Sequence, residues 1–184
     1  EAEGRASDFV MGFEESYGYL AGTHARDKDA VVASMLICEM AAYYKTKNMN
    51  LVDVMNSLYD EFGYYANVVE SYTFEGAAGM DKMASIMDTL RTNPPKEIAG
   101  MAVTAVSDYE SSTITYADGS PSKTIDLPKS NVLAFDLTDG NKLIVRPSGT
   151  EPKIKAYITA IGTDKDSAHN LADILVEAAG RFME

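Results

Sequence analysis

The chain has 184 residues and a formal net charge of −12, with 46% hydrophobic and 24% charged residues. This balance is typical of a folded protein, and the length allows one ordinary domain or two small ones. Nucleic-acid binding needs a Lys/Arg surface that releases counterions, so the acidic balance argues against DNA, RNA and anionic membranes as partners.

Cysteine usage and the start of the chain bear on location. The lone Cys38 lies in an apolar helical stretch, which predicts a buried structural thiol and a reducing, cytoplasmic environment. No apolar run approaches the roughly 18 residues that a membrane-spanning helix needs, and residues 1–8 lack the features of a targeting signal. Because the sequence begins without Met at a polar stretch, we expect a piece of a longer protein.

The first elements are a short strand, a loop and a helix. An apolar run over residues 9–11 predicts the strand, and the loop after it is punctuated by Gly12, Gly18 and Gly22. The helix, over residues 29–45, is apolar around much of its circumference. We therefore expect it to be an inner helix, packed on more than one side.

A second helix and a change of character follow. Asn50 is placed to cap a helix over residues 51–62, and Gly63 suits its exit. Residues 64–74 are rich in Tyr, Val and Thr, which predicts a strand. The chain is therefore expected to change domain near Gly63.

The rest of the chain predicts an α+β domain. Gly76 and Gly79 open a third helix, which Asn93-Pro94-Pro95 ends. Strands are predicted over residues 101–106, 113–116, 131–137, 142–146 and 154–160. Asp139-Gly140 is a strong hairpin signal, and Thr163 is expected to cap a last helix. The pattern indicates an antiparallel sheet covered by two helices.

A loop between the last two strands, RPSGTEPK over residues 146–153, has the chemistry of an anion cradle. Arg146 offers a planar fork of donors that matches phosphate, and Ser148 and Thr150 add hydroxyl groups. Gly149 lets backbone amides approach an oxyanion without a Cβ in the way. An ordinary polar turn is the alternative, because Ser, Gly, Thr and Pro are turn residues.

One member of this loop opposes anion binding. The carboxylate of Glu151 would repel a phosphate, so we expect it to point outward or to pair with Lys153 or Lys155.

The longer string RPSGTEPKIKAY resembles the phosphate-binding loop in the last domain of the α-D-phosphohexomutases, the phosphoglucomutase/phosphomannomutase type. In that loop Arg, Ser and Thr hold the phosphate of the sugar that is not reacting. The resemblance implies phosphate contacts at Arg146, Ser148, Gly149 and Thr150, with Lys153 as a possible further contact.

A second motif, GFEESYGYL over residues 12–20, places carboxylates and a hydroxyl in a loop bounded by glycines. Ionised carboxylates accept several hydrogen bonds, so sugar hydroxyls are natural partners, and a Glu-rich helix start is the alternative. The motif resembles the sugar-specificity loop of the same family, which implies sugar contacts at Glu14, Glu15 and Ser16. Some members, including bifunctional phosphomannomutases, have Gly-His in place of Tyr17-Gly18, and this departure favours the glucose-selective branch.

The segment HARDKD over residues 24–29 resembles the basic segment that follows this loop in phosphoglucomutases. The resemblance implies that Lys28 faces the active site, where it would act as a catalytic cation on the transferring phosphoryl group or the sugar oxygen. His24 and Arg26 are further possible site residues. A solvated helix start with local ion pairs is the alternative for Arg26 and Lys28, and a structural role is the alternative for His24.

The resemblance covers essentially the whole chain. It implies that residues 1–63 are the end of the family's third, α/β domain, with the sugar loop and two helices. Residues 64–184 would be the fourth, α+β domain, with the phosphate loop.

The resemblance also implies a reaction, the interconversion of hexose 1-phosphate and hexose 6-phosphate through a bisphosphorylated sugar. That reaction needs a phosphoserine and a Mg²⁺ site in earlier domains, and this chain has neither the donor loop nor an Asp-Gly-Asp run. We therefore expect Mg²⁺ and the hexose 1,6-bisphosphate activator to serve the full-length parent, with no metal or cofactor bound to this fragment, which alone would be inactive. Its partners would be a phosphosugar and the remaining N-terminal domains.

Several alternatives stay open. Phosphomannomutase, phosphopentomutase and phosphoglucosamine mutase activities are neighbours within the same class. A non-catalytic sugar-phosphate-binding module is a second reading of the two motifs. A protein-interaction domain that uses the open edge of the predicted sheet is a third, and an exposed apolar edge without Arg146 facing a cleft would favour it.

Overall fold

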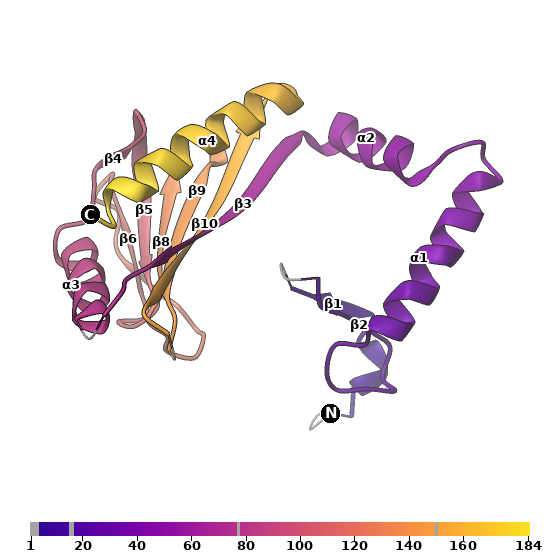
Figure 1. Cartoon of the computed structure of the whole chain (residues 1–184), viewed down its shortest axis with the longest axis horizontal. Coiled ribbons are helices and arrows are strands. Elements are labelled where there is room, and N and C mark those ends of the chain that lie inside the picture. Colours follow the sequence, from indigo (N-terminus) through magenta and orange to yellow (C-terminus); the bar gives the residue numbers. More distant parts are fainter. Residues whose placement is uncertain (1–3, 15–16, 77, 150) are drawn as a thin grey trace. The chain divides into compact units, whose positions relative to one another are not determined.

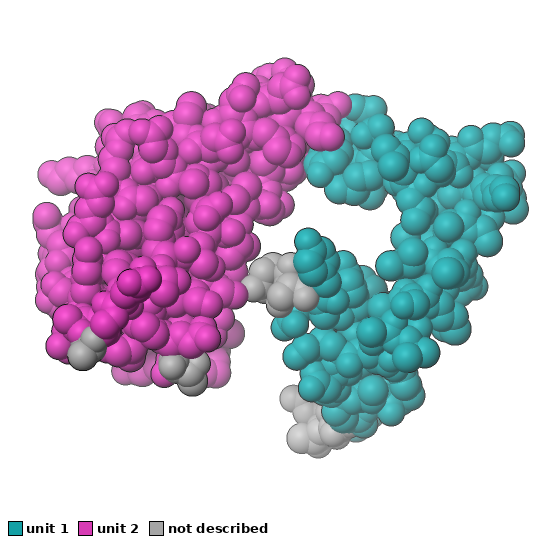
Figure 2. Space-filling model, viewed as in Figure 1, with its two compact units in different colours: residues 1–61 teal, residues 62–184 magenta. Residues whose placement is uncertain are grey.

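The computed structural model describes residues 4–14, 17–76, 78–149 and 151–184. These residues form two compact units, unit 1 over residues 1–61 and unit 2 over residues 62–184 (Figure 2).

Unit 1 begins with a 3-10 turn and an antiparallel hairpin. The bounds are Ala6–Asp8 for the turn, Met11–Phe13 for β1 and Tyr19–Ala21 for β2. The predicted strand forms, but its predicted bounds of 9–11 are wrong, because pairing starts only at Met11. Gly12 pairs with Leu20 and has no side chain, so the ring of Phe9 folds back to within 3.6 Å of where a Cβ on Gly12 would lie.

Helix α1 (Ala30–Lys45) forms where it was predicted, but the expectation that it is an inner helix is wrong for this chain. None of its residues is buried, and Val31 and Met35 are 80% and 57% exposed. Cys38 is exposed as well, so the expected buried thiol is also wrong. In this unit α1 packs mainly against β2, and an apolar helix becomes buried only where an opposing surface covers it.

Helix α2 (Leu51–Phe62) has the predicted cap. Asn50 Oδ1 accepts hydrogen bonds from the amides of Val52 and Asp53 at 2.8 and 3.0 Å, and Asp53 Oδ2 accepts one from the Asn50 amide at 2.8 Å. This reciprocal arrangement satisfies the free N–H groups at the helix start. Gly63 follows with φ of +99°, a backbone conformation that favours glycine.

Unit 2 is built on an antiparallel sheet, with the strands in the order β3-β10-β9-β8-β5-β6-β7 and β4 paired to β5 (Figure 1). The strands are β3 (Tyr64–Thr73), β4 (Glu97–Ile98), β5 (Met101–Asp108), β6 (Thr113–Tyr116), β7 (Lys123–Thr124), β8 (Leu133–Leu137), β9 (Lys142–Pro147) and β10 (Lys153–Gly162). All the strands predicted for this half form. The two that were not predicted, β4 and β7, are two residues long, too short to show an alternating pattern.

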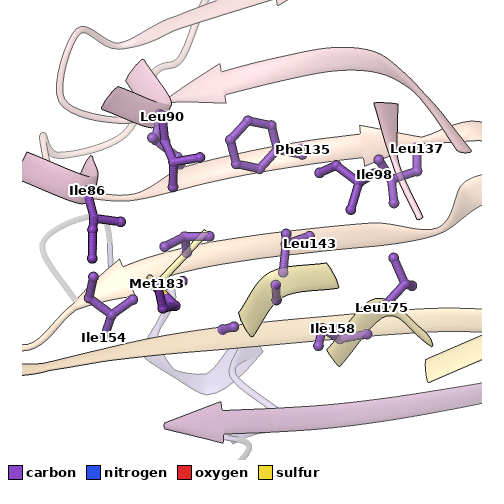
Figure 3. Close-up of a cluster of buried hydrophobic side chains, with 14 of the residues drawn as sticks. Ile86, Leu90, Ile98, Phe135, Leu137, Leu143, Ile154, Ile158, Leu175 and Met183 are labelled. Atoms are coloured by element: carbon purple, nitrogen blue, oxygen red, sulfur yellow. The ribbon is translucent and has the colours of Figure 1, made fainter. Parts of the chain in front are cut away.

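Helices α3 (Gly79–Thr92) and α4 (Lys165–Arg181) pack on one face of this sheet. Side chains of both helices and of the central strands form one core, including Ile86, Leu90, Phe135, Leu143, Ile154, Ile158 and Leu175 (Figure 3). The predicted α+β arrangement, an antiparallel sheet covered by two helices, is confirmed. Side chains alternate between the two faces along each strand, so those at the remaining strand positions point to the opposite face of the sheet.

Two local predictions in unit 2 have different outcomes. The Asp139-Gly140 turn forms with φ of 59° and 79°, the left-handed values that a tight hairpin requires. Thr163, however, is not the cap of the last helix. Asp164 is the cap, because its Oδ1 accepts from the Ser167 amide at 2.8 Å while Ser167 Oγ accepts from the Asp164 amide at 3.0 Å.

A search of the described residues for a helix both long and apolar enough to cross a membrane gave none.

Candidate functional site

The predicted phosphate loop joins β9 to β10, which are adjacent antiparallel strands. Ile154 pairs with Pro147, and one step further along the ladder Lys155 pairs with Arg146. Val145 and Ile154 point into the core, so Arg146, Lys153 and Lys155 belong to the face opposite to α3 and α4. The hairpin register thus brings three cationic residues to one end of the sheet.

Hydrogen bonds at its base fix the shape of this loop. The Ser148 amide donates to the Lys153 carbonyl at 2.7 Å, and the Phe74 amide donates to the Pro152 carbonyl at 2.8 Å. A Cβ on Gly79 would lie 3.1 Å from Pro152 Cβ, so the start of α3 packs closely on the loop. The loop is therefore held from three sides before any ligand arrives, which lowers the ordering cost of binding.

The loop and the strand ends enclose a hollow of about 440 Å³, lined by Arg146, Pro147, Ser148, Gly149, Glu151, Lys153 and Lys155. Glu151 pairs with Lys153, with Nζ 2.9 Å from Oε2, which confirms the pairing expected from the sequence. Lys153, and to a smaller extent Lys155, hold the pKa of Glu151 below its ordinary value. One carboxylate is thus set against three cations, and the hollow is left with a positive excess.

Gly149 and Thr150 are the two remaining predicted phosphate contacts at the tip of this loop. Gly149 lines the hollow, and a Cβ built on it would meet no atom within 4 Å. Nothing in the described part of the chain therefore requires glycine at this position, and a requirement would have to come from a ligand. Thr150 lies outside the described residues.

The predicted sugar loop is the turn of the β1–β2 hairpin. The Glu14 amide donates to the Gly18 carbonyl at 3.0 Å, which closes the turn. Glu14 lines a hollow of about 230 Å³ together with Phe9, Gly12, Phe13, Gly18, Leu20, Arg26, Asp27 and Lys28. The other two predicted sugar contacts, Glu15 and Ser16, lie outside the described residues.

Lys28 and Glu14 are brought together across this hollow. Lys28 Nζ lies 3.1 Å from Asp27 Oδ1 and 3.9 Å from Glu14 Oε1, and these carboxylates, Asp27 first, raise the pKa of Lys28. Gly18 is buried between the two side chains: a Cβ there would lie 2.5 Å from Glu14 Oε1 and 2.6 Å from Lys28 Cγ. Glycine at this position is therefore what allows Glu14 and Lys28 to approach each other.

The two possible site residues of the basic segment have local partners. His24 Nε2 lies 2.7 Å from Asp29 Oδ2, and Arg26 Nη1 donates to the carbonyls of Thr23 and Ala25 at 2.6 and 3.2 Å. Arg26 also lines the hollow that holds Glu14, whereas His24 does not. The local ion pairs expected under the alternative reading are thus present, together with a shared hollow that this reading does not require.

Comparison with known families decides the affiliation. A family model for the phosphoglucomutase/phosphomannomutase alpha/beta/alpha domain III matches residues 2–62, and one for the phosphoglucomutase/phosphomannomutase C-terminal domain matches residues 83–178. The chain belongs to this family. The two motifs found in the sequence therefore lie in neighbouring domains of one family, in the order that the resemblance implied.

Curated relatives of this phosphoglucomutase/phosphomannomutase chain include two phosphoglucomutases of Staphylococcus aureus. The one from strain MRSA252 is 41% identical over 159 residues, which is 86% of this chain and 29% of the relative. The one from strain MSSA476 is 40% identical over 152 residues, which is 83% of this chain and 27% of the relative. The chain thus spans less than a third of the length of these relatives.

A solved structure has the same fold. The open form of parafusin from Paramecium, an exocytosis-sensitive phosphoprotein described as a phosphoglucomutase, superimposes with a TM-score of 0.56 at 19% identity. The match covers 92% of this chain and 30% of parafusin. At this identity the likeness supports the fold alone.

Position 17 of this family member has an unusual backbone. Tyr17 has φ of 64°, in the left-handed region, and is 89% exposed. A bulky residue rarely adopts this conformation, whereas glycine adopts it freely.

Lys155 was missed as a site residue by sequence reasoning, which considered it only as a partner for Glu151. Its position across the ladder from Arg146 makes it part of the hollow. The predicted strand bounds, 142–146 and 154–160, did not fix this register, because a shift of one residue would pair Arg146 with Ile154 instead of Lys155.

A metal site was not expected in this family member's sequence. Within the described ranges, no three His, Cys, Asp or Glu side chains gather closely enough to hold a metal ion. Asp27 and Asp29 are instead engaged with Lys28 and with His24.

Proposed function

We propose that this chain supplies the sugar-hydroxyl and distal-phosphate contacts of a phosphohexose mutase that interconverts hexose 1-phosphate and hexose 6-phosphate through a bisphosphorylated sugar. The observation that carries the proposal is the hollow at the turn between β9 and β10, which Arg146, Lys153 and Lys155 line together with the glycine-containing loop. We further propose that the domain border lies between residues 63 and 64.

The chemistry of this hollow suits a phosphate monoester. A guanidinium binds two phosphate oxygens at once, and ammonium groups act as point charges beside it. We propose that Arg146 takes this bidentate role, with Ser148, Gly149 and Thr150 as neighbouring donors and Lys155 as a second cation. Lys153 is already paired with Glu151, so its contribution would be weaker.

The chemistry of the hairpin turn suits a sugar hydroxyl. The Glu14 carboxylate is exposed and 3.9 Å from Lys28 Nζ, a separation that leaves its oxygens accessible to a polyol. We propose that Glu14 accepts hydrogen bonds from the hexose, with Glu15 and Ser16 as further contacts. Lys28 would stabilise negative charge on the reacting groups.

Other parts of the reaction belong to the remainder of a longer protein in this proposal. We propose that Mg²⁺ and the phosphoserine are held by other domains of that longer protein. The hexose 1,6-bisphosphate would be the activator of that protein. We also propose a cytoplasmic location and a preference for glucose over mannose.

The test is a titration of the chain with glucose 1-phosphate and glucose 6-phosphate, with free glucose and inorganic phosphate as controls. Backbone amide shifts at Gly149 and Gly18 are followed by NMR in the wild type, in Arg146→Ala and in the matched Arg181→Ala. Arg181 pairs with Glu177 on the exposed side of α4, away from the loop. We expect every phosphate to shift Gly149, sugar phosphates alone to shift Gly18, and only Arg146→Ala to abolish the first response.

Equal responses in the two arginine variants would refute the phosphate assignment. A shift at Gly18 with inorganic phosphate alone would refute the sugar assignment. Turnover by the longer protein, measured with the bisphosphate and Mg²⁺, separates a mutase from a binding module without catalysis. Because Arg146 lines a hollow, the alternative of a protein-interaction domain loses the observation that would have favoured it.

A further inference from the structure

The segment between β2 and α1 is fastened at both ends. The Gly22 amide donates to the Val10 carbonyl at 3.2 Å, and the Asp29 amide donates to the Tyr19 carbonyl at 2.7 Å. Residues 23–28 lie between these two attachments. Such a loop has a fixed start and end, but the path between them needs further contacts to be defined.

Asp29 supplies the further contact. Its Oδ1 accepts from the amides of Val31 and Val32 at 2.9 and 3.2 Å, which caps α1. Its Oδ2 lies 2.7 Å from His24 Nε2. Hydrogen bonding to His24, and then to the Val32 amide, lowers the pKa of Asp29, so the carboxylate is ionised at neutral pH and can only accept. The donor in this pair is therefore His24.

The residues enclosed by this contact are those that face Glu14. Arg26, Asp27 and Lys28 line the hollow that contains the Glu14 side chain. Lys28 immediately precedes Asp29, whose position is set by the start of α1 and by β2. A hydrogen bond from His24 to Asp29 closes a ring of backbone around the three lining residues and fixes the path that they follow.

We propose that His24 and Asp29 are positioning residues that hold Lys28 beside Glu14. The inference deepens the proposed function and rests on it. A lysine side chain has four rotatable bonds, so its head group can be placed accurately only if its backbone is fixed. A displacement of about 1 Å in such a group can cost up to about 100-fold in rate.

The helix cap and the hydrogen bond to His24 use different oxygens of Asp29, so the two contacts can be tested separately. His24→Ala removes the donor and leaves the Asp29 Oδ1 cap of α1 in place. His24→Gln restores an N–H donor of similar reach. His169→Ala is the matched control, because His169 lies on α4, where its Nδ1 contacts the Lys165 carbonyl at 2.7 Å. All three variants are made both in the longer protein and in the 184-residue chain.

In the longer protein we expect His24→Ala to lower kcat about tenfold with KM changed less than about twofold. His24→Gln should recover most of the loss, and His169→Ala should match the wild type. In the 184-residue chain, His24→Ala should shift the amides of residues 26–28 while the amides of Val31 and Val32 stay in place. A purely structural role would lower Tm without lowering kcat at a nearly constant KM.

Three results would overturn the inference. Unshifted amides at residues 26–28 in His24→Ala would show that the contact does not set the loop, whatever the activity. A shifted loop with unchanged kcat in an active enzyme would show that its position does not matter for the reaction. Failure of His24→Gln to restore kcat would show that the donor is not what matters. A wild-type protein without mutase activity would refute the proposed function first, before any variant is compared.

Discussion

Unit 1 and unit 2 both carry helices with many apolar side chains, yet among the described residues only those of unit 2 form a buried core. Helix α4 buries Ala168, Ala172, Leu175 and Ala179 against β10 and β3. Helix α1 is the more apolar of the two and buries none of its residues. The difference lies in what faces each helix, a long sheet in unit 2 and a hairpin of two three-residue strands in unit 1.

An apolar helix becomes buried only where another surface of the protein covers it, and its own sequence does not supply that surface. The family model that matches unit 1 describes an alpha/beta/alpha domain, a layered architecture that requires a sheet between helices. We propose that the remainder of this sheet belongs to another part of the longer protein. The site loops of the two units are nevertheless each held by contacts within their own unit, so both can be tested in this chain.

The sharpest test of the comparison is a matched pair of phenylalanines. Phe135 on β8 is fully buried, whereas Phe13 on β1 is 74% exposed. We expect Phe135→Ala to lower the free energy of unfolding of unit 2 by about 3–5 kcal/mol, because it removes packing and leaves a cavity. Phe13→Ala should cost at most about 1.5 kcal/mol, because it removes only the ring contact with Tyr19 across the hairpin. Urea unfolding of both variants measures this, and similar losses would break the comparison.

A second test compares two glycines in the two loops. Gly18→Ala should cost about 1–3 kcal/mol of local stability and separate Glu14 from Lys28, because the new methyl group collides with both side chains. Gly149→Ala should leave stability within about 0.5 kcal/mol, since its methyl group would point into open space.

Amide exchange and NMR spectra of the two glycine variants give these values. If Gly149→Ala also keeps its affinity for phosphate, the backbone of this loop does not approach the anion.

A third test addresses Lys155, which the strand register places opposite Arg146 in the hollow. Lys155→Ala should weaken phosphate binding by about tenfold, which corresponds to the lower end of a charge-assisted contact. Lys129→Ala, in an exposed loop outside the hollow, is the control. Isothermal titration with glucose 6-phosphate provides the measurement, and equal affinities in the two variants would exclude Lys155 from the site.

The smallest expected effect is the pH dependence of the α4 cap. Hydrogen bonds from the backbone and side chain of Ser167 lower the pKa of Asp164 in the folded state. The group therefore contributes stability that is complete above the unfolded pKa of about 3.9 and is lost as pH falls through the lower folded pKa.

Urea midpoints between about pH 2 and pH 6 measure this contribution. Asp164→Asn, which can still cap a helix, should flatten the acid limb relative to the wild type. An unchanged acid limb would assign the pH dependence to other carboxylates.

Local signals predicted much of the fold. Asn50 before an apolar periodic run gave the cap of α2, and Asp139-Gly140 gave the β8–β9 turn, because each depends on contacts within a few residues. The assignment of Thr163 as a cap was wrong, although it too rested on neighbouring residues. Thr163 and Asp164 both have capping side chains, and only the reciprocal bonds with Ser167 select between them.

The sequence by itself determined the family and the two loop motifs, since these follow from neighbouring residues and short spacings, and it limited the partners of Glu151 to Lys153 or Lys155, of which the structure selects Lys153. Only the tertiary structure decided that Lys155 stands across from Arg146, that Gly18 is the contact point of Glu14 and Lys28, and that α1 and Cys38 are exposed in this chain. Pairing across a ladder, the space around a side chain and burial all depend on which other surfaces are present. A periodic pattern in one segment carries no information about them.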